Sequence, residues 1–149
     1  MPIVDDVTAA IAQAMRKQDA VRLAPLRMLK AAFMNKSVEK GRALDDAEAR
    51  QVVSSLVKQR KDSIEQFTKG GRKDLADKEA GEITVLEAYL PPAVDPAAVD
   101  QAVADAIAET GATSAKDMGR VMKAVMSKLA GQNVDGKTVN ELVRRKLGA

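Results

Sequence analysis

The stretch KDMGRVMKAVMSKLAGQNVDGKTVNELVRRKLGA, residues 116–149, decides how the C-terminal part of the chain folds. Its apolar residues recur at intervals of three and four over 118–129 and again over 139–147, which is the pattern of two amphipathic helices. Ser114 and Asp117 are expected to cap the first helix, and Gly131 is expected to end it. Asp135 is expected to begin the second helix, because its carboxylate can accept the free amides of a first turn.

The outer faces of these two helices are predicted to be basic. Residues 116–149 contain eight basic and three acidic residues, whereas residues 93–115 contain four acidic residues and no basic one. Lysines and helix N-termini attract phosphate groups, so this asymmetry is compatible with an anion-binding face. On charge alone, the sequence favours the simpler interpretation of a solvated helical surface that complements the helix macrodipole.

The composition of the 149 residues is that of a globular protein, with 46% hydrophobic and 30% charged residues. Only Phe33, Phe67 and Tyr89 are aromatic, so the core must be aliphatic. The net charge of +3 is too small for a protein that coats nucleic acid, and any such contact must therefore be local.

The cellular location is predicted to be cytoplasmic, without contact to a membrane. The sequence contains no cysteine, which fits a reducing compartment. It shows no pattern typical of a signal peptide, and no segment approaches the roughly 20 apolar residues of a membrane span.

Five more helices are expected ahead of the C-terminal pair, over residues 3–17, 19–40, 45–68, 73–90 and 95–111. Asp19 is expected to cap the second of these helices, and Asp45 and Glu48 form a capping-box pattern ahead of the third. Asp95 is expected to cap the fifth, because it precedes a proline that suits the first position of a helix. Pro25 predicts either a kink in the second helix or a start nearer Ala24, because proline removes a backbone donor. Two consecutive prolines at 91 and 92 block the fourth helix.

The fold is therefore predicted to be all-α, with seven helices and no strand. We expect a four-helix N-terminal domain over residues 1–92 and a small three-helix C-terminal domain over residues 93–149. A unit of this second size buries a limited core, so its stability is expected to be marginal when it is isolated.

Catalytic chemistry is weakly indicated. The chain has no histidine and no cysteine, and no glycine-rich nucleotide-binding motif follows a strand pattern. Two carboxylate groups, at 45–48 and at 74–79, fit helix caps and surface ion pairs better than a metal site. We expect no catalytic residue, no metal site and no cofactor.

Two clusters of basic residues lie among apolar neighbours: Arg27 with Lys30, and Lys58 with Arg60 and Lys61. Such side chains can line a groove, or they can extend over the edge of the core toward carboxylates such as Asp62 or Glu87. The structural role is favoured, because partly buried basic residues usually have an acidic partner.

Several strings of the sequence resemble the GatB/YqeY family, in order and over nearly the whole chain. They are LRMLKA at 26–31, KQRKDS at 58–63, Glu82 with LEAYLP at 86–91, DMGRVM at 117–122, and DGK at 135–137 with Val139 and Asn140. The resemblance is to a stand-alone YqeY-like protein, whose C-terminal part is similar to the tail of the B subunit of glutamine-dependent tRNA amidotransferase. It implies a helical domain followed by a three-helix tail.

The resemblance also implies a function. The amidotransferase tail is associated with holding tRNA, whereas the chemistry belongs to a catalytic domain and a subunit that this chain does not resemble. A non-catalytic tRNA-binding module is therefore expected, with tRNA or a complex for tRNA processing or aminoacylation as its partner. The residues that match the tail motif are the candidate RNA-binding residues: Gly119, Arg120, Lys123, Lys137, Asn140 and Arg144.

Two other functions remain open at this point. One is a component of a carbon–nitrogen ligase with glutamine as amido-N-donor, the amidotransferase-type activity that the family name carries. The other is a helical adaptor that binds protein through a groove near Pro25. Relatives in the family often have a basic residue directly after the glycine at 131, but this chain has Gln132 there. That difference weakens the case for a phosphate-binding loop.

Overall fold

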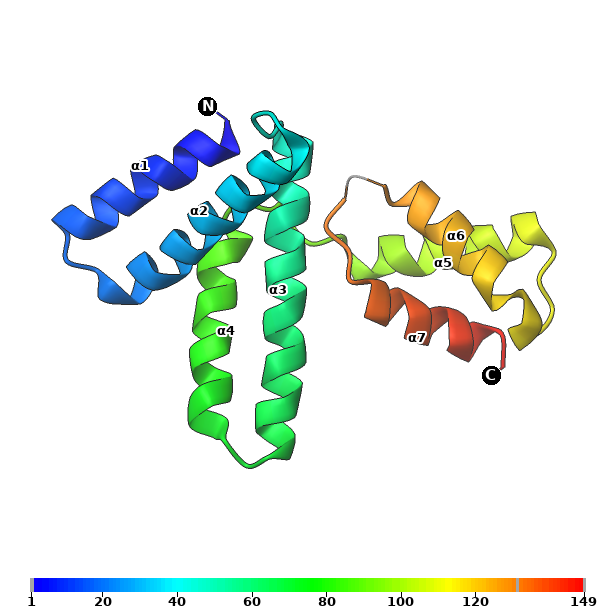
Figure 1. The fold of residues 1–149 in the computed structure, drawn as a ribbon. Coiled ribbons are helices and arrows are strands. Elements are labelled where there is room, and N and C mark those ends of the chain that lie inside the picture. The colour runs from blue at the N-terminus through cyan, green and yellow to red at the C-terminus, as the bar shows by residue number, and fades with distance from the viewer. Residues whose placement is uncertain (1, 131, 149) are drawn as a thin grey trace. The chain divides into compact units, whose positions relative to one another are not determined.

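The computed structural model describes residues 2–130 and 132–148. Over these residues the chain forms seven α-helices and one short 3₁₀ turn, with no strand (Figure 1). The all-α class predicted from the sequence is confirmed. The expected helix end at Gly131 lies outside the described residues. The chain divides into two units, Met1–Leu90 and Pro91–Ala149, and each is described by itself.

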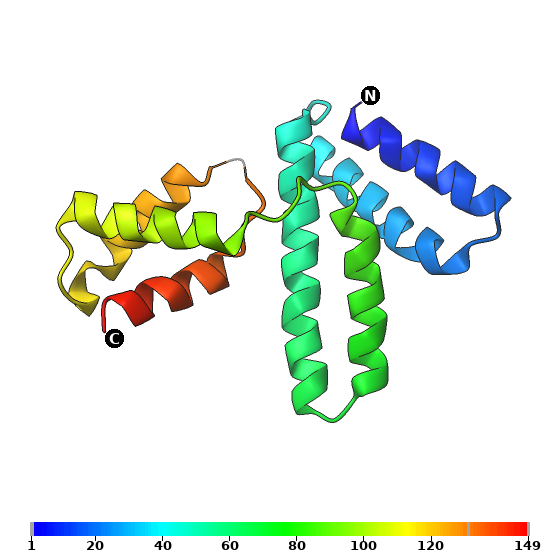
Figure 2. The same ribbon diagram turned by 180° about the vertical axis from the view of Figure 1, so that it is seen from behind.

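Unit 1 contains α1 (Ile3–Arg16), α2 (Ala20–Lys40), α3 (Asp46–Lys69) and α4 (Lys73–Glu87). The α3 and α4 helices form a long antiparallel hairpin, and α2 packs against both (Figures 1 and 2). The largest fully buried side chains of this unit are aliphatic or phenyl groups, among them Val7, Leu26, Leu29, Phe33 and Leu86. The α4 helix ends at Glu87, three residues before the expected end.

Pro25 lies inside α2 and is buried. The helix nevertheless begins at Ala20, where the Asp19 carboxylate accepts a hydrogen bond of 3.2 Å from the Arg22 amide. The predicted alternative start near Ala24 is therefore wrong. Proline costs this helix one backbone donor near its start, and the carbonyl deprived of that donor belongs to Val21, whose residue is 78% exposed to water.

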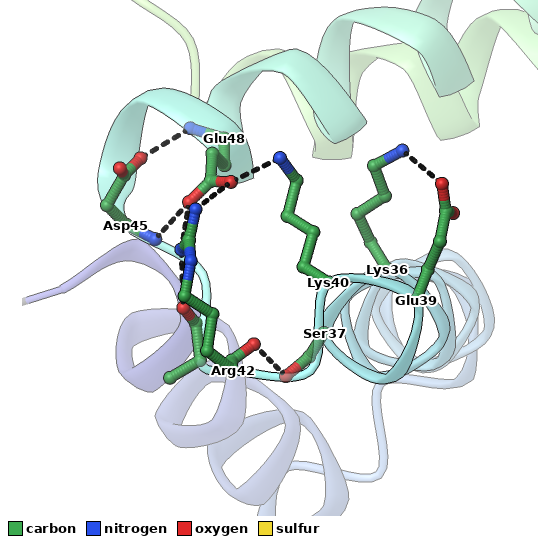
Figure 3. Close-up of polar contacts among 8 residues, drawn as sticks. Lys36, Ser37, Glu39, Lys40, Arg42, Asp45 and Glu48 are labelled. Carbon is green, nitrogen blue, oxygen red and sulfur yellow. Dashed lines mark hydrogen bonds and ion pairs between the residues drawn. The ribbon is translucent and has the colours of Figure 1, made fainter.

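The turn between α2 and α3 is held by a polar network around Glu48 (Figure 3). Glu48 and Asp45 form the predicted capping box, with amide-to-carboxylate distances of 2.8 and 3.1 Å. The Glu48 carboxylate also accepts two hydrogen bonds from the Arg42 guanidinium, at 2.7 and 2.9 Å, and lies 2.6 Å from Lys40 Nζ. Arg42 first and Lys40 second hold the pKa of Glu48 far below its usual range.

Arg60 is buried in unit 1, with 5% of its surface exposed. Its Nε donates to Glu82 at 2.9 Å, and Glu79 lies 3.9 Å away, so both acidic partners come from α4. The structural role predicted for this arginine is confirmed, but the suggested partners Asp62 and Glu87 are wrong. Arg60 shares the face of α3 that packs on α4, whereas Asp62 is exposed on the other side of the helix.

Unit 2 contains α5 (Pro96–Thr110), the 3₁₀ turn η1 (Ala115–Asp117), α6 (Met118–Lys128) and α7 (Gly136–Lys146). The direction of α6 is opposite to that of α5 and α7 (Figures 1 and 2). Asp95 caps α5 by accepting from the Ala97 amide at 2.8 Å, directly ahead of the proline predicted at the first position. Six core positions of the unit are valines: Val99, Val103, Val121, Val125, Val139 and Val143.

Candidate nucleic-acid interface

The start of α6 differs from the predicted cap. Ser114 makes no side-chain capping bond, because the 3₁₀ turn places the first α-helical residue at Met118. The Asp117 carboxylate instead reaches back to the Thr113 amide at 3.0 Å and accepts from Arg120 Nη2 at 2.5 Å. These contacts, with that to Thr113 first, lower the pKa of Asp117. The positive charge of Arg120 is thus partly neutralised within the protein.

Two candidate residues of α6 lie on its outward face, because Val121 and Val125 fill the inward one. Lys123 is exposed, and no carboxylate of the described residues lies within ion-pair distance of its ammonium group. Gly119 is also exposed, and a Cβ atom added there would meet nothing within 4 Å. The outward face of α6 therefore offers both a free cation and bare backbone.

The start of α7 is capped as predicted. The Asp135 carboxylate accepts from the Lys137 amide at 3.0 Å and from the Thr138 hydroxyl at 3.5 Å. Lys137 is exposed in the first turn, while Asn140 is half-buried at the edge of the core. Because Asp135 binds the first-turn amide and adds a negative charge, this helix terminus is a poor anion site.

The loop before α7 is used for internal contacts. Asn133 Nδ2 donates to the Pro91 carbonyl at 2.9 Å, and the Asn133 carbonyl accepts from the Val94 amide at 3.0 Å. A single parallel bridge joins Ala93 to Asn133. These bonds tie the loop to the first residues of unit 2, which agrees with the weak case for a phosphate-binding loop.

Two other basic residues of the α6–α7 hairpin are paired with α5. Lys128 lies 2.6 Å from Glu109, and Lys146 lies 3.1 Å from Asp100. Their charges bind neighbouring helices together and contribute less to the outward potential. Neither was a candidate residue.

The opposite directions of α6 and α7 separate the candidate residues. The first turns of α6, with Arg120 and Lys123, lie at the same end of the hairpin as the last turn of α7, with Arg144 (Figure 1). Lys137 belongs to the other end. Two exposed cations that the motif match omitted, Lys116 and Arg145, belong to the first end. The sequence could have indicated both residues if the two C-terminal helices had been assumed to form an antiparallel hairpin with a short loop.

Unit 1 offers no comparable chemistry in the residues that the structure describes. No group of three acidic side chains there, or elsewhere among 2–130 and 132–148, could hold a metal ion. Asp74 and Asp77 are paired with Arg72 and Lys73, as expected of surface ion pairs. No described helix has the length and apolar character needed to pass through a lipid bilayer.

These features define an all-helical protein with two helical units, the second of which bears a basic hairpin. The chain belongs to the YqeY family, since the sequence model of that family, described as Yqey-like protein, matches residues 4–147. The family predicted from the sequence strings is thereby confirmed.

The curated relatives include several that are named "Altered inheritance of mitochondria protein 41, mitochondrial". The protein of Pyrenophora tritici-repentis is 29% identical over 99% of this chain and 82% of its own length. That of Lachancea thermotolerans is 35% identical over 65% of this chain and 54% of its own, and that of Kluyveromyces lactis is 38% identical over 56% and 48%. The chain therefore spans about half the length of these last two relatives.

The predicted cytoplasmic location is contradicted by these names, which point to mitochondria. The prediction rested on the lack of cysteine and of a signal-peptide pattern. A reducing environment is not unique to the cytoplasm, so composition could not distinguish the compartments.

Proposed function

We propose that the protein is a non-catalytic accessory module that binds tRNA through the outward face of the α6–α7 hairpin. The observation that supports this proposal best is the pair Lys123 and Arg144. Both side chains are exposed, and they come from the antiparallel helices α6 and α7. Neither has a carboxylate within ion-pair distance among the described residues. Lys116 and Arg145 extend the same basic end. Phosphate groups bind to such uncompensated cations.

The absence of aromatic side chains from this part of the chain indicates which kind of RNA it would bind. Residues 93–149 contain no aromatic side chain on which an unpaired base could stack. Recognition therefore depends on phosphate positions and on the shape of a folded RNA rather than on a single-stranded sequence. The other function implied by the resemblance, a carbon–nitrogen ligase component, has less support, because the chain contains no histidine or cysteine and does not resemble the catalytic domain of the amidotransferase.

The test compares two matched double variants of the full chain. Lys123→Ala with Arg144→Ala should weaken binding to bulk tRNA and lower the slope of log K against log salt by about 0.7–0.9 for each lost phosphate contact. Lys58→Ala with Lys78→Ala removes the same charge from exposed positions of unit 1 and should leave the slope unchanged. Equal losses in both variants, or equal affinity for tRNA and an arbitrary duplex of equal charge, would contradict the proposal.

A further inference from the structure

The α2 helix carries apolar residues on both of its sides. Leu26, Leu29 and Phe33 fill the core of unit 1. The opposite side is exposed, and it holds four of the six large apolar residues that stand out as exposed in the described part of the chain: Val21 (78%), Met28 (51%), Met34 (60%) and Val38 (81%). A monomeric surface rarely gathers its large apolar residues on one helix face, so this face fits an interaction.

The spacing on this exposed side is that of a two-helix seam. Positions separated alternately by three and four residues are all exposed, and five of the six are apolar: Val21, Ala24, Met28, Ala31, Asn35 and Val38. This is the heptad pattern through which two helices pack against each other in a coiled coil. Asn35 is the polar member, of the type that fixes the register of such a pair. We call these six residues the outer α2 seam.

An apolar groove of about 460 Å³ adjoins the seam. Val4, Phe33, Met34, Val38 and Leu44 are among its lining residues, so it lies between the start of α1, the second half of α2 and the turn that follows. Met34 and Val38 line the groove and are also exposed beside or within the seam. A large apolar side chain of an adjacent helix could be buried there.

The charges around the seam indicate what such a helix carries. Toward α3, the cations of α2 are paired, Lys36 with Glu39 at 3.2 Å and Lys40 with Glu48 at 2.6 Å (Figure 3). Arg27 and Lys30 flank the seam, and neither has a carboxylate within ion-pair distance among residues 2–130 and 132–148. A carboxylate on the partner would complement both cations.

A second copy of this chain that paired through its own α2 would not supply that carboxylate. In a parallel α2 pair, heptad geometry places Arg27 opposite Ala32 of the other copy. In an antiparallel pair, it places Arg27 opposite Met34 or another Arg27. We propose that the outer α2 seam and its groove bind an amphipathic helix of a different protein, with carboxylates along one edge of its apolar stripe. This proposal is independent of RNA binding.

The experiment uses the full chain and two synthetic helical peptides of about three heptads. Both have leucine and isoleucine at seam positions; one has glutamate at the flanking positions and the other lysine. Fluorescence anisotropy should show that the glutamate peptide binds roughly threefold or more tightly. Arg27→Glu with Lys30→Glu should reverse that preference, whereas Lys58→Glu with Lys78→Glu, which changes the net charge by the same amount at exposed positions of α3 and α4, should not.

A second pair of variants tests the seam itself. Ala31→Gln places a bulky polar side chain at its centre and should weaken binding of the glutamate peptide, while Ala80→Gln, at an exposed position of α4, should not. The proposal is wrong if the two peptides bind equally, if Ala80→Gln is as harmful as Ala31→Gln, or if light scattering reveals a dimer of the protein that Ala31→Gln dissociates.

Discussion

The guanidinium of Arg120 donates to the carboxylate of Asp117 at 2.5 Å, across one turn at the start of α6. The same carboxylate accepts from the Thr113 amide. Asp117 therefore shapes the chain ahead of α6 and also lowers the availability of a candidate phosphate-binding group. A substitution that removes the charge of Asp117 but keeps the hydrogen bond to Thr113 can therefore test the effect of charge on RNA binding without changing the fold.

Asp117→Asn is expected to strengthen RNA binding. Asparagine can still accept the Thr113 hydrogen bond, but it no longer neutralises Arg120. The slope of log K against log salt should become steeper by up to about 0.9, the value for one added phosphate contact. Asp105→Asn raises the net charge equally from an exposed position of α5 and is the control. A similar gain with this control would show that Arg120 makes no specific contact.

Gly119→Ala is expected to lower the affinity for RNA without lowering the stability of the protein. An added Cβ meets nothing within 4 Å. Gly119 lies in the first turn of α6, so alanine should stabilise it by no more than the roughly 1 kcal/mol that separates alanine from glycine in a helix interior. The melting temperature should therefore rise or stay constant. RNA affinity should fall, because the bare backbone that permits close approach is lost. Gly81→Ala, equally open in α4, should stabilise without changing affinity; a loss of affinity there as well would count against the interface.

Glu48→Gln is expected to lower the melting temperature at neutral pH, because the carboxylate that joins Arg42 and Lys40 loses its charge. The pKa of Glu48 is lowered in the folded protein, so its stabilisation is present above the ordinary glutamate pKa and is lost as the pH falls toward the folded value. The difference between wild type and variant should thus shrink in acid. Asp77→Asn breaks only the exposed pair with Lys73 and should change little. A difference for Glu48→Gln that is independent of pH would exclude an ionic origin.

Limited proteolysis is expected to cleave first within residues 91–96. This segment follows α4 and ends at Pro96, the first residue of α5, and it contains three prolines among exposed and half-buried residues. Such linkers open more readily than the continuous hydrogen-bonded backbone of α3. Mass spectrometry of the earliest fragments measures the order of cleavage. Early cuts within α3 would argue against separate domains over 1–92 and 93–149.

Local signals accounted for most of the fold. Asp19, Asp45, Asp95 and Asp135 all cap helices in the structure as predicted, because each cap depends on a few consecutive residues. Ser114 failed as a cap because a short 3₁₀ turn intervenes before α6. Sequence spacing alone does not separate a 3₁₀ start from an α-helical one.

Tertiary contacts account for what the sequence did not indicate. The partner of the buried Arg60 is Glu82, 22 positions away, and only the packing of α3 on α4 selects it over nearer carboxylates. The outer α2 seam was hidden for a similar reason. Both sides of α2 are apolar, and the pattern by itself does not tell which side the core covers. Likewise, the sequence alone did not place Arg145 at the same end as the first turns of α6, whereas the antiparallel hairpin does (Figure 1).

The segregation of charge within unit 2 has a kinetic consequence. Residues 91–149 have eight basic and seven acidic side chains, so the net attraction to a polyanion is small at a distance. Four of the acidic residues lie at the start of α5 or along it, and the basic ones lie on or next to α6 and α7. This separation should give the unit an electric dipole, which the pairs Lys128–Glu109 and Lys146–Asp100 reduce. The electric field of an approaching polyanion would rotate unit 2 so that its basic side faces the polyanion before the two make contact. Added salt would therefore slow association through lost orientation as well as lost attraction.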